Sequence, residues 1–229
     1  MVLDKKPAPD STSKAILTMV ERFEQRNMGE KWKGRHVSRP ADIVRYVCWL
    51  YLTGSNKRDP FLKPYPKITK SHPKGLPWEV ITVIRARGKG KGTLLKQEIP
   101  IFDPVEEKLW RKVLSDFETM ELDDLFERLE KRDVNNRLTN IIQHNFRYDM
   151  RDAVSHKLLK NAPFTPQSFR YHRLYNLYVE RGLDEGYILS FFGWKDTRVL
   201  KSKEVLGSQK EYDQMRALRK LSKASQIDY

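Results

Sequence analysis

Apolar residues recur at helical spacing along most of this chain. The pattern predicts helices at 13–27, 40–53, 103–117, 122–132, 134–148, 166–181 and 208–222, with a short one at 184–192. Two stretches rich in β-branched residues, 79–87 and 97–101, predict a pair of antiparallel strands. Residues 60–78 hold five of the twelve prolines, which indicates an extended connection. We therefore predict a mainly α fold with a small antiparallel β-sheet, in the α+β class.

The same pattern predicts a single domain over residues 13–207. Residues 1–12 are rich in Pro, Lys and Ser and indicate a flexible tail. Residues 208–229 are predicted to form a C-terminal helix and tail. This segment packs either on its own domain or on a second copy of the chain, and the second arrangement would make the protein a homo-oligomer.

Charge narrows the choice of partner. The chain has 229 residues, with 44 Lys and Arg against 30 Asp and Glu, which gives a formal net charge of +14. Such an excess on a foldable chain favours a polyanion, with nucleic acid ahead of a membrane surface or an acidic protein. No apolar run reaches about eighteen residues, so we expect no membrane span and a cytoplasmic protein associated with the nucleoid or chromosome.

The residue types that hold metals or disulfides give no signal. Cys48 is the only cysteine, so no disulfide forms within the chain. The five histidines lack metal-ligand spacing. We therefore expect no metal and no cofactor.

The helix predicted at 166–181 carries an unusual arginine. Thr165 can cap this helix, Pro166 suits its first position, and Gln167 and Arg170 fall on the inward stripe one turn before Leu174. Burying an unpaired guanidinium costs several kcal/mol or more. Arg170 is therefore interpreted either as the partner of a structural carboxylate or as a partly sunken cation aimed at a phosphate.

The order helix, Gly182, short helix and Gly193-Trp194 resembles the second half of the catalytic domain of tyrosine recombinases (integrases), with the archaeal branch the nearest. In that family the helix reads His-x-x-Arg-His-x-Arg-Leu, and Gly-His or Gly-Trp follows about twenty residues later. Here the helix reads Gln-Ser-Phe-Arg-Tyr-His-Arg-Leu from Gln167. The resemblance runs from near residue 38 to about residue 205 and implies a tyrosine recombinase catalytic-domain-like fold.

A second motif of the family, Thr-Gly-x-Arg-x-x-Glu, corresponds to the residues that follow the helix at 40–53. The chain reads Thr-Gly-Ser-Asn-Lys-Arg-Asp from Thr53, so the acidic position is Asp59. Asn56 occupies the position of the phosphate-binding arginine, and Arg58 lies two residues further on. An amide cannot balance an anionic phosphate as a guanidinium does.

The two predicted strands are joined by Gly-Lys-Gly-Lys-Gly at 88–92. This loop lacks the Gly-Lys-Ser/Thr order and joins strand to strand, which favours a basic hairpin tip over a nucleotide-binding P-loop. Period-two alternation predicts that Arg85, Arg87 and Lys89 project from one face as a cationic row suited to a phosphate backbone. The resemblance implies that Lys89 or Lys91 takes the place of the family's catalytic lysine. The alternative is a solvated hairpin that is merely basic.

The family's nucleophile is a tyrosine about nine residues after the Gly-His or Gly-Trp pair. Lys203 stands at that position, and the next tyrosines are Tyr212 and Tyr229. Tyr212 lies on the predicted C-terminal helix and is interpreted as an anchoring core residue rather than the nucleophile. Gln167, at the position of the family's histidine, cannot shuttle a proton near neutral pH.

These observations predict a double-stranded DNA-binding protein on a tyrosine-recombinase catalytic-domain scaffold, without strand-cleavage activity. The family-equivalent catalytic positions are Asn56, Arg58, Lys89, Lys91, Gln167, Arg170, Trp194, Lys203 and Tyr212. The candidate DNA-binding residues are Lys57, Arg58, Arg85, Arg87, Lys89, Lys91, Arg170, Arg173, Lys195 and Arg198. Two alternatives remain open. One is an active recombinase that uses Tyr212, with Arg58 in place of the missing arginine, and the other is an RNA-binding or assembly protein.

Overall fold

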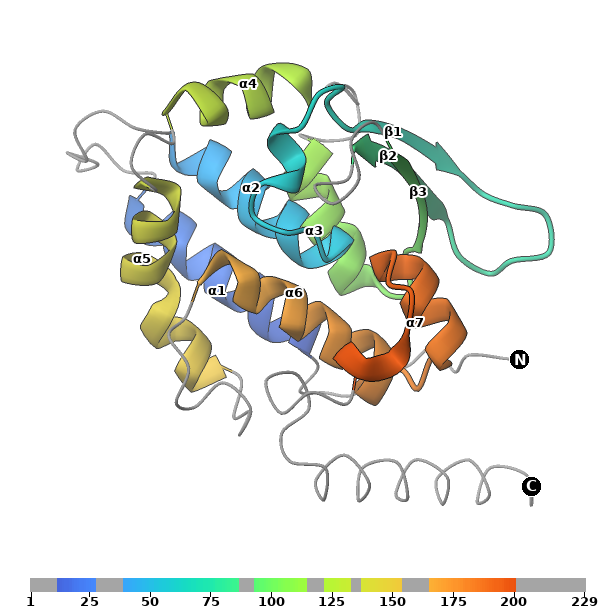
Figure 1. Ribbon diagram of the computed structural model, residues 1–229. Coiled ribbons are helices and arrows are strands. Elements are labelled where there is room, and N and C mark those ends of the chain that lie inside the picture. Colours follow the sequence, from blue (N-terminus) through green and yellow to red (C-terminus); the bar gives the residue numbers. More distant parts are fainter. Residues whose placement is uncertain are drawn as a thin grey trace.

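A computed structural model describes residues 12–27, 39–86, 93–114, 122–132, 137–153 and 165–200. Within this part of the chain the protein is mainly helical with a small antiparallel sheet, as the sequence predicted (Figure 1). Helices α1 to α6 span Thr12–Asn27, Pro40–Thr53, Pro104–Leu114, Asp123–Arg132, Arg137–Ala153 and Pro166–Tyr175. None of the described helices has the length and apolar character needed to cross a membrane.

Helix α2 lies at the centre of the fold because it is apolar on nearly every side. Its residues from Asp42 to Thr53 are buried with the exception of Arg45, and it packs against α1, α3 and α6. Pro40 occupies its first turn, and Gly54 ends it in the left-handed conformation with φ of 58°. The sequence predicted both ends.

The sheet contains three strands, β1 at Lys67–Ser71, β2 at Val80–Ala86 and β3 at Leu94–Pro100, in the order β1-β2-β3. Both pairings are antiparallel, with Thr69 opposite Thr82 and Thr82 opposite Glu98. The sequence predicted β2 and β3 but treated β1 as part of an extended connection. This strand fits between Pro66 and Pro73 and pairs along one side only, so the prolines around it do not interrupt the sheet.

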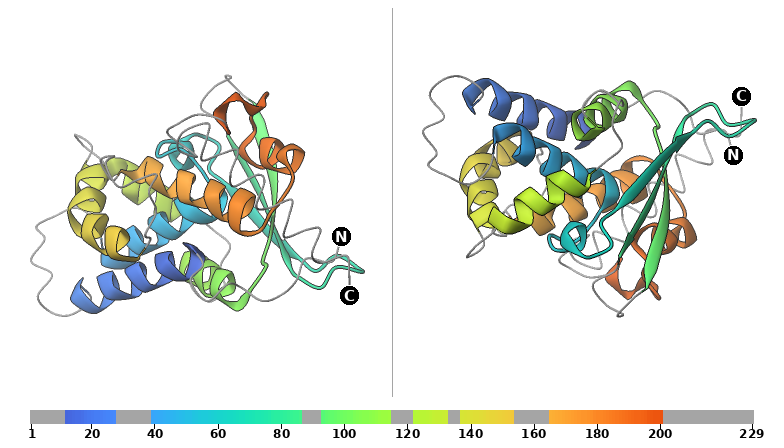
Figure 2. Two further views of the ribbon diagram at one scale, coloured as in Figure 1. Left: turned by 90° about the horizontal axis from the view of Figure 1, so that it is seen from below. Right: turned by 90° about the horizontal axis from the view of Figure 1, so that it is seen from above.

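One face of the sheet lies on the helical body (Figure 2). Ile81, Val83 and Ile99 point to that face and are buried, whereas Ile84 and Leu94 point to the other face and are exposed. The connection between β1 and β2 extends away from the helices (Figure 1, right). The tip of the β2–β3 hairpin, residues 87–92, lies outside the described residues.

Residues 165–193 form two helices with ends where the sequence predicted them. Thr165 and Ser168 form a capping box at the start of α6, which continues as a π-helical turn, Asn176–Glu180. Gly182 adopts φ of 63°, and Asp184 caps the next helix, α7, at Glu185–Phe192. The helix predicted at 208–222 lies outside the described residues.

Candidate functional site

The C-terminal ends of α2 and α7 meet beside the sheet. Each ends in a left-handed glycine, Gly54 with φ of 58° and Gly193 with φ of 64°. A Cβ on Gly54 would lie 2.3 Å from Cε1 of Phe192, which is closer than real Cβ contacts come. Glycine is therefore required at residue 54 for its conformation and also for the approach of α7.

Arg170 of α6 lies at this junction. Its side chain is buried, with 5% of the residue's surface exposed, and its Nη1 donates a hydrogen bond to the carbonyl of Gly54. Its guanidinium carbon lies 4.9 Å from the ring centre of Phe192 and 5.1 Å from that of Trp194. The two rings stack on each other with their centres 4.6 Å apart. Aromatic faces and the carbonyl end of a helix both favour a cation, so the site suits a guanidinium.

Residues of three separate sequence motifs thus converge at one point. Gly54 belongs to the Thr-Gly motif after α2, Arg170 to the motif on α6, and Trp194 to the Gly-Trp pair after α7. Gly54 and Arg170 are 116 residues apart in the sequence. Gln167 and Trp194 are half-buried, so the neighbourhood of Arg170 is partly open to solvent.

The loop after Gly54 is held by its own side chains. The backbone N–H and Nδ2 of Asn56 each donate to Oδ2 of Asp59, both at 3.1 Å. Arg85 of β2 forms a buried ion pair with the same carboxylate at 2.9 Å. Asn56 therefore stabilises the turn that follows α2, and Asp59 joins that turn to the sheet.

The expectation that Arg85 projects from the hairpin as an exposed cation is wrong, since only 1% of its surface is exposed. It follows Ile81 and Val83 on the face that lies on the helical body, and there it meets Asp59. Arg87, Lys89 and Lys91 lie outside the described residues.

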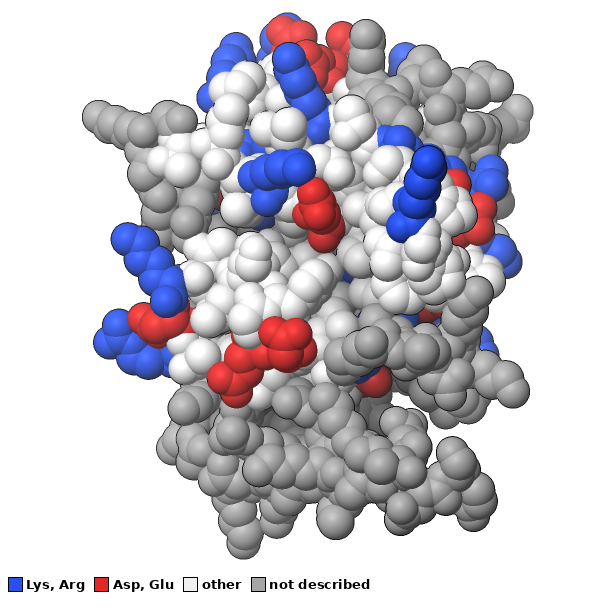
Figure 3. Space-filling view, turned by 90° about the vertical axis from the view of Figure 1, so that its right-hand side faces the viewer, with Lys and Arg blue, Asp and Glu red and all other residues white. Residues whose placement is uncertain are grey.

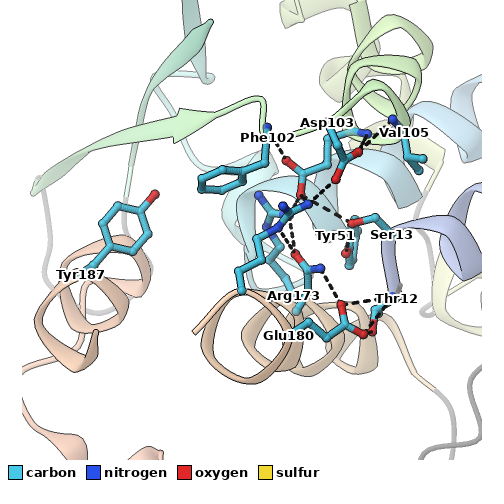
Figure 4. Close-up of polar contacts among 12 residues, drawn as sticks. Thr12, Ser13, Tyr51, Phe102, Asp103, Val105, Arg173, Glu180 and Tyr187 are labelled. Carbon is cyan, nitrogen blue, oxygen red and sulfur yellow. Dashed lines mark hydrogen bonds and ion pairs between the residues drawn. The ribbon is translucent and has the colours of Figure 1, made fainter. Parts of the chain in front are cut away.

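Arg173 also differs from its prediction as a DNA-facing residue. It is fully buried, and its Nη1 contacts Oε1 of Glu106 at 2.5 Å and Oδ1 of Asn176 at 3.0 Å. Arg181 contacts the same Glu106 oxygen at 2.9 Å and pairs with Asp103 (Figure 4). The reason is tertiary packing, because Glu106 of α3 lies against Arg173 and the spacing along α6 does not reveal this partner.

Glu106 and Arg173 are both charged in the folded protein. Burial by itself would raise the pKa of Glu106, but Arg173, Arg181 and the hydrogen bonds outweigh it and lower that pKa. Burial would likewise lower the pKa of Arg173, but Glu106 outweighs it and the pKa is raised. The pair is therefore a closed internal ion pair, typical of a structural role.

The cluster extends to the first described helix. Nδ2 of Asn176 donates to Glu180 at 2.7 Å, and Glu180 accepts from the backbone N–H of Thr12 at 3.0 Å and from its hydroxyl at 2.6 Å. Next to Glu106, the hydroxyls of Ser13 and Tyr51 share a buried hydrogen bond of 2.8 Å. No sequence pattern indicates this network, because charged residues at helical spacing resemble a solvated helix face until the packing is known.

Gln97 of β3 was also not among the candidate residues predicted from the sequence. It is buried, with 2% exposed, and its Nε2 donates to the carbonyl of Thr53 at 2.8 Å and to that of Phe191 at 2.9 Å. One signal was available, because period two places a polar residue at 97 on the inward face together with Ile99.

The remaining candidate cations differ in exposure. Arg58, Lys195 and Arg198 are exposed and Lys57 is partly buried, while Arg198 pairs with Asp196 at 2.8 Å. Figure 3 shows the face that carries the sheet and α7, where Lys and Arg are spread with Asp and Glu among them. Lys203 and Tyr212 lie outside the described residues.

In the part of the chain that the structure describes, no three His, Cys, Asp or Glu side chains form a group that could hold a metal ion. Comparisons with protein-family models, with curated proteins and with solved structures found no match. The geometry of the junction around Arg170 therefore carries the functional argument.

Proposed function

We propose that this protein binds double-stranded DNA on a tyrosine-recombinase catalytic-domain scaffold and does not cleave it. The observation that carries the proposal is the meeting of Gly54, Arg170 and Trp194, whose motifs the sequence resemblance had matched separately. A chain in which these motifs were chance matches would have no reason to bring them to one junction.

The order of the elements supports the same scaffold. A buried helix ends in Thr53-Gly54, a three-stranded antiparallel sheet follows, and further helices lead to the one that carries Arg170. A short helix then ends in Gly193-Trp194. The resemblance implies this order of motifs, although it did not include the strand β1.

The absence of cleavage is argued from three positions. Asn56 stands where the family has a phosphate-binding arginine, and its amide is used to hold the turn through Asp59. Gln167 cannot act as a general acid or base near neutral pH. Lys203 occupies the expected position of the nucleophile, and losing the nucleophile removes the covalent route.

DNA affinity survives such changes because it comes mainly from many distributed lysine and arginine contacts. A net charge of +14 supplies them, and exposed cations lie close to the junction in sequence at Arg58, Lys195 and Arg198. Binding without catalysis is therefore physically consistent.

The first experiment measures binding of a labelled DNA duplex as a function of salt. We expect the affinity to fall by orders of magnitude between about 50 and 200 mM salt, as counterion release requires. The same assay is run with structured RNA as competitor. If RNA displaces the duplex at lower concentration than unlabelled duplex does, the protein is an RNA binder and the proposal is wrong.

The second experiment tests cleavage with a nicked suicide substrate, on the wild-type chain and on Tyr212→Phe. We expect no covalent protein–DNA complex from either. A covalent complex that forms with the wild type and not with Tyr212→Phe would identify an active recombinase with Tyr212 as its nucleophile.

A further inference from the structure

The two hydrogen bonds of Gln97 end next to the groups that surround Arg170. One goes to the carbonyl of Thr53, and the next residue, Gly54, has the carbonyl that accepts from Arg170. The other goes to the carbonyl of Phe191, and the next residue, Phe192, has a ring in contact with the guanidinium. One side chain thus joins the two helix ends between which Arg170 lies.

The chemistry at this position requires a donor. Thr53 and Phe191 belong to the last turns of α2 and α7, where carbonyls have no partner within their own helix. A primary amide nitrogen can donate to both carbonyls without bringing a charge into the core. A carboxylate would place acceptors against acceptors, and an apolar side chain would leave both carbonyls without this donor.

The other end of the amide indicates that the donors are what matters. Gln97 is buried, yet its Oε1 has no hydrogen-bond partner among the described residues. A buried acceptor without a partner lowers stability relative to an apolar side chain of the same shape. An amide in this place is understandable if its two donated bonds serve the geometry of the junction.

We propose that Gln97 is a positioning residue that fixes the ends of α2 and α7 against each other and so sets Arg170 and Trp194 for contact with a DNA phosphate. The clause on phosphate contact rests on the proposed function. The positioning of Trp194 does not, and it can be measured without DNA.

The first test uses the indole N–H resonance of Trp194 in ¹⁵N-labelled protein, identified as the signal missing from Trp194→Phe. We expect Gln97→Met to shift this resonance, because the ends of α2 and α7 lose their shared donor. The matched control is Ile99→Val, a change two residues along the same inward face of β3, which should leave the resonance in place.

The second test is a double-mutant cycle on duplex affinity. We expect Gln97→Met to weaken binding by about three- to tenfold, and to have no further effect in the Arg170→Gln background, because the two residues act on one contact. A residue with a merely structural role would weaken binding equally in both backgrounds. Ile99→Val should change affinity by less than about twofold.

Two results would overturn the proposal: an unshifted Trp194 resonance in Gln97→Met, or an undiminished loss of affinity in the Arg170→Gln background. If Gln97→Met fails to fold, the same comparisons are made with Gln97→Asn, whose amide is uncharged but one methylene shorter, so that it cannot donate to both carbonyls as Gln97 does. If the wild-type chain does not bind duplex, the proposed function fails, and the resonance of Trp194 alone decides whether Gln97 positions the junction.

Discussion

Arg170 and Arg173 lie one turn apart on α6 and both are buried. Both guanidiniums lie over two aromatic rings, Phe192 and Trp194 for Arg170 and Tyr51 and Phe191 for Arg173, but their polar contacts differ. Arg173 pairs with Glu106 and contacts Asn176, inside a network that includes Arg181. The contacts described for Arg170 are with a backbone carbonyl and two aromatic rings, at the junction of two helix ends.

The ion pair with Glu106 explains the burial of Arg173, and we propose a different role for Arg170. The sequence left open whether an inward arginine on this helix meets a structural carboxylate or a phosphate. The carboxylate is found at Arg173, where the ion pair joins α6 to α3. Arg170 lies beside half-buried Trp194 and the loop after α2, and the proposed function gives it a phosphate contact. The comparison predicts that changes around Arg173 affect folding, whereas changes around Arg170 affect binding.

The largest effect is expected for Glu106→Gln, which leaves Arg173 buried without its carboxylate. Removing one partner of a buried ion pair destabilises by about 3–5 kcal/mol. Urea unfolding followed by circular dichroism would measure it, and duplex affinity of the folded fraction should change by less than about twofold. The control is Glu107→Gln, where an exposed pair with Arg111 is lost and less than about 1 kcal/mol is expected. An equal effect of the two substitutions would contradict the structural role of the cluster.

The pH dependence of stability tests the same carboxylate. The folded-state pKa of Glu106 is held below the ordinary glutamate value of 4.5 by Arg173 and Arg181, so the stabilisation is fully present above about 4.5 and is lost as pH falls through the lower folded value. The free energy of unfolding of the wild type should therefore fall in acid more steeply than that of Glu106→Gln. The two curves should converge at low pH, because protonated Glu resembles Gln. Curves that stay parallel down to low pH would show that Glu106 is not ionised in the fold.

Gly54→Ala is expected to have the next largest effect on stability. It should also affect duplex binding, so it tests folding and binding together. A left-handed alanine costs about 1–2 kcal/mol, and the clash of its Cβ with Phe192 adds about 1–3 kcal/mol of overpacking. Phe192 contacts Arg170, so duplex affinity should fall as well. Gly75→Ala is the matched control, with φ of 84° and nothing within 4 Å of the added Cβ. Gly75→Ala should lower stability only by the cost of a left-handed alanine and leave duplex affinity unchanged. An equal loss of stability in the two variants would argue against crowding between residue 54 and Phe192.

The sequence predicted what depends on local pattern, namely the helices, their glycine ends and the caps at Thr165 and Asp184. It missed what depends on which elements pack together. Arg85 was placed on an exposed row although Ile81 and Val83 precede it on the buried face. The partners Glu106 and Asp59 are 67 and 26 residues from their arginines, so no spacing rule could have paired them. The role of Gln97 could not be predicted without knowing that the ends of α2 and α7 meet beside β3.

Arg170→Gln tests the binding side of the comparison directly. We expect duplex affinity to fall about tenfold, which is about 1.4 kcal/mol, and the salt dependence to flatten by about one unit because one phosphate contact is lost. Arg22→Gln, at an exposed position on α1, makes the same charge change and should do neither. If Arg170→Gln destabilises the fold as Glu106→Gln does and leaves the affinity of the folded protein unchanged, both arginines are structural and the distinction between them fails.

The smallest effect is expected from a single lysine of the predicted hairpin tip, and it sets a scale for Arg170. Lys89→Ala should weaken duplex binding by a similar factor for every DNA sequence and flatten the salt dependence by about one unit, since phosphate contacts carry no sequence information. Lys96→Ala is the control, because Lys96 is exposed on the outer face of β3 and pairs with Glu98 at 2.8 Å. An unchanged affinity and salt dependence in Lys89→Ala would remove the hairpin from the DNA interface. The interface would then consist of the junction around Arg170 and the exposed cations that follow α2 and α7, and the loss in Arg170→Gln should make up a correspondingly larger share of the total salt dependence.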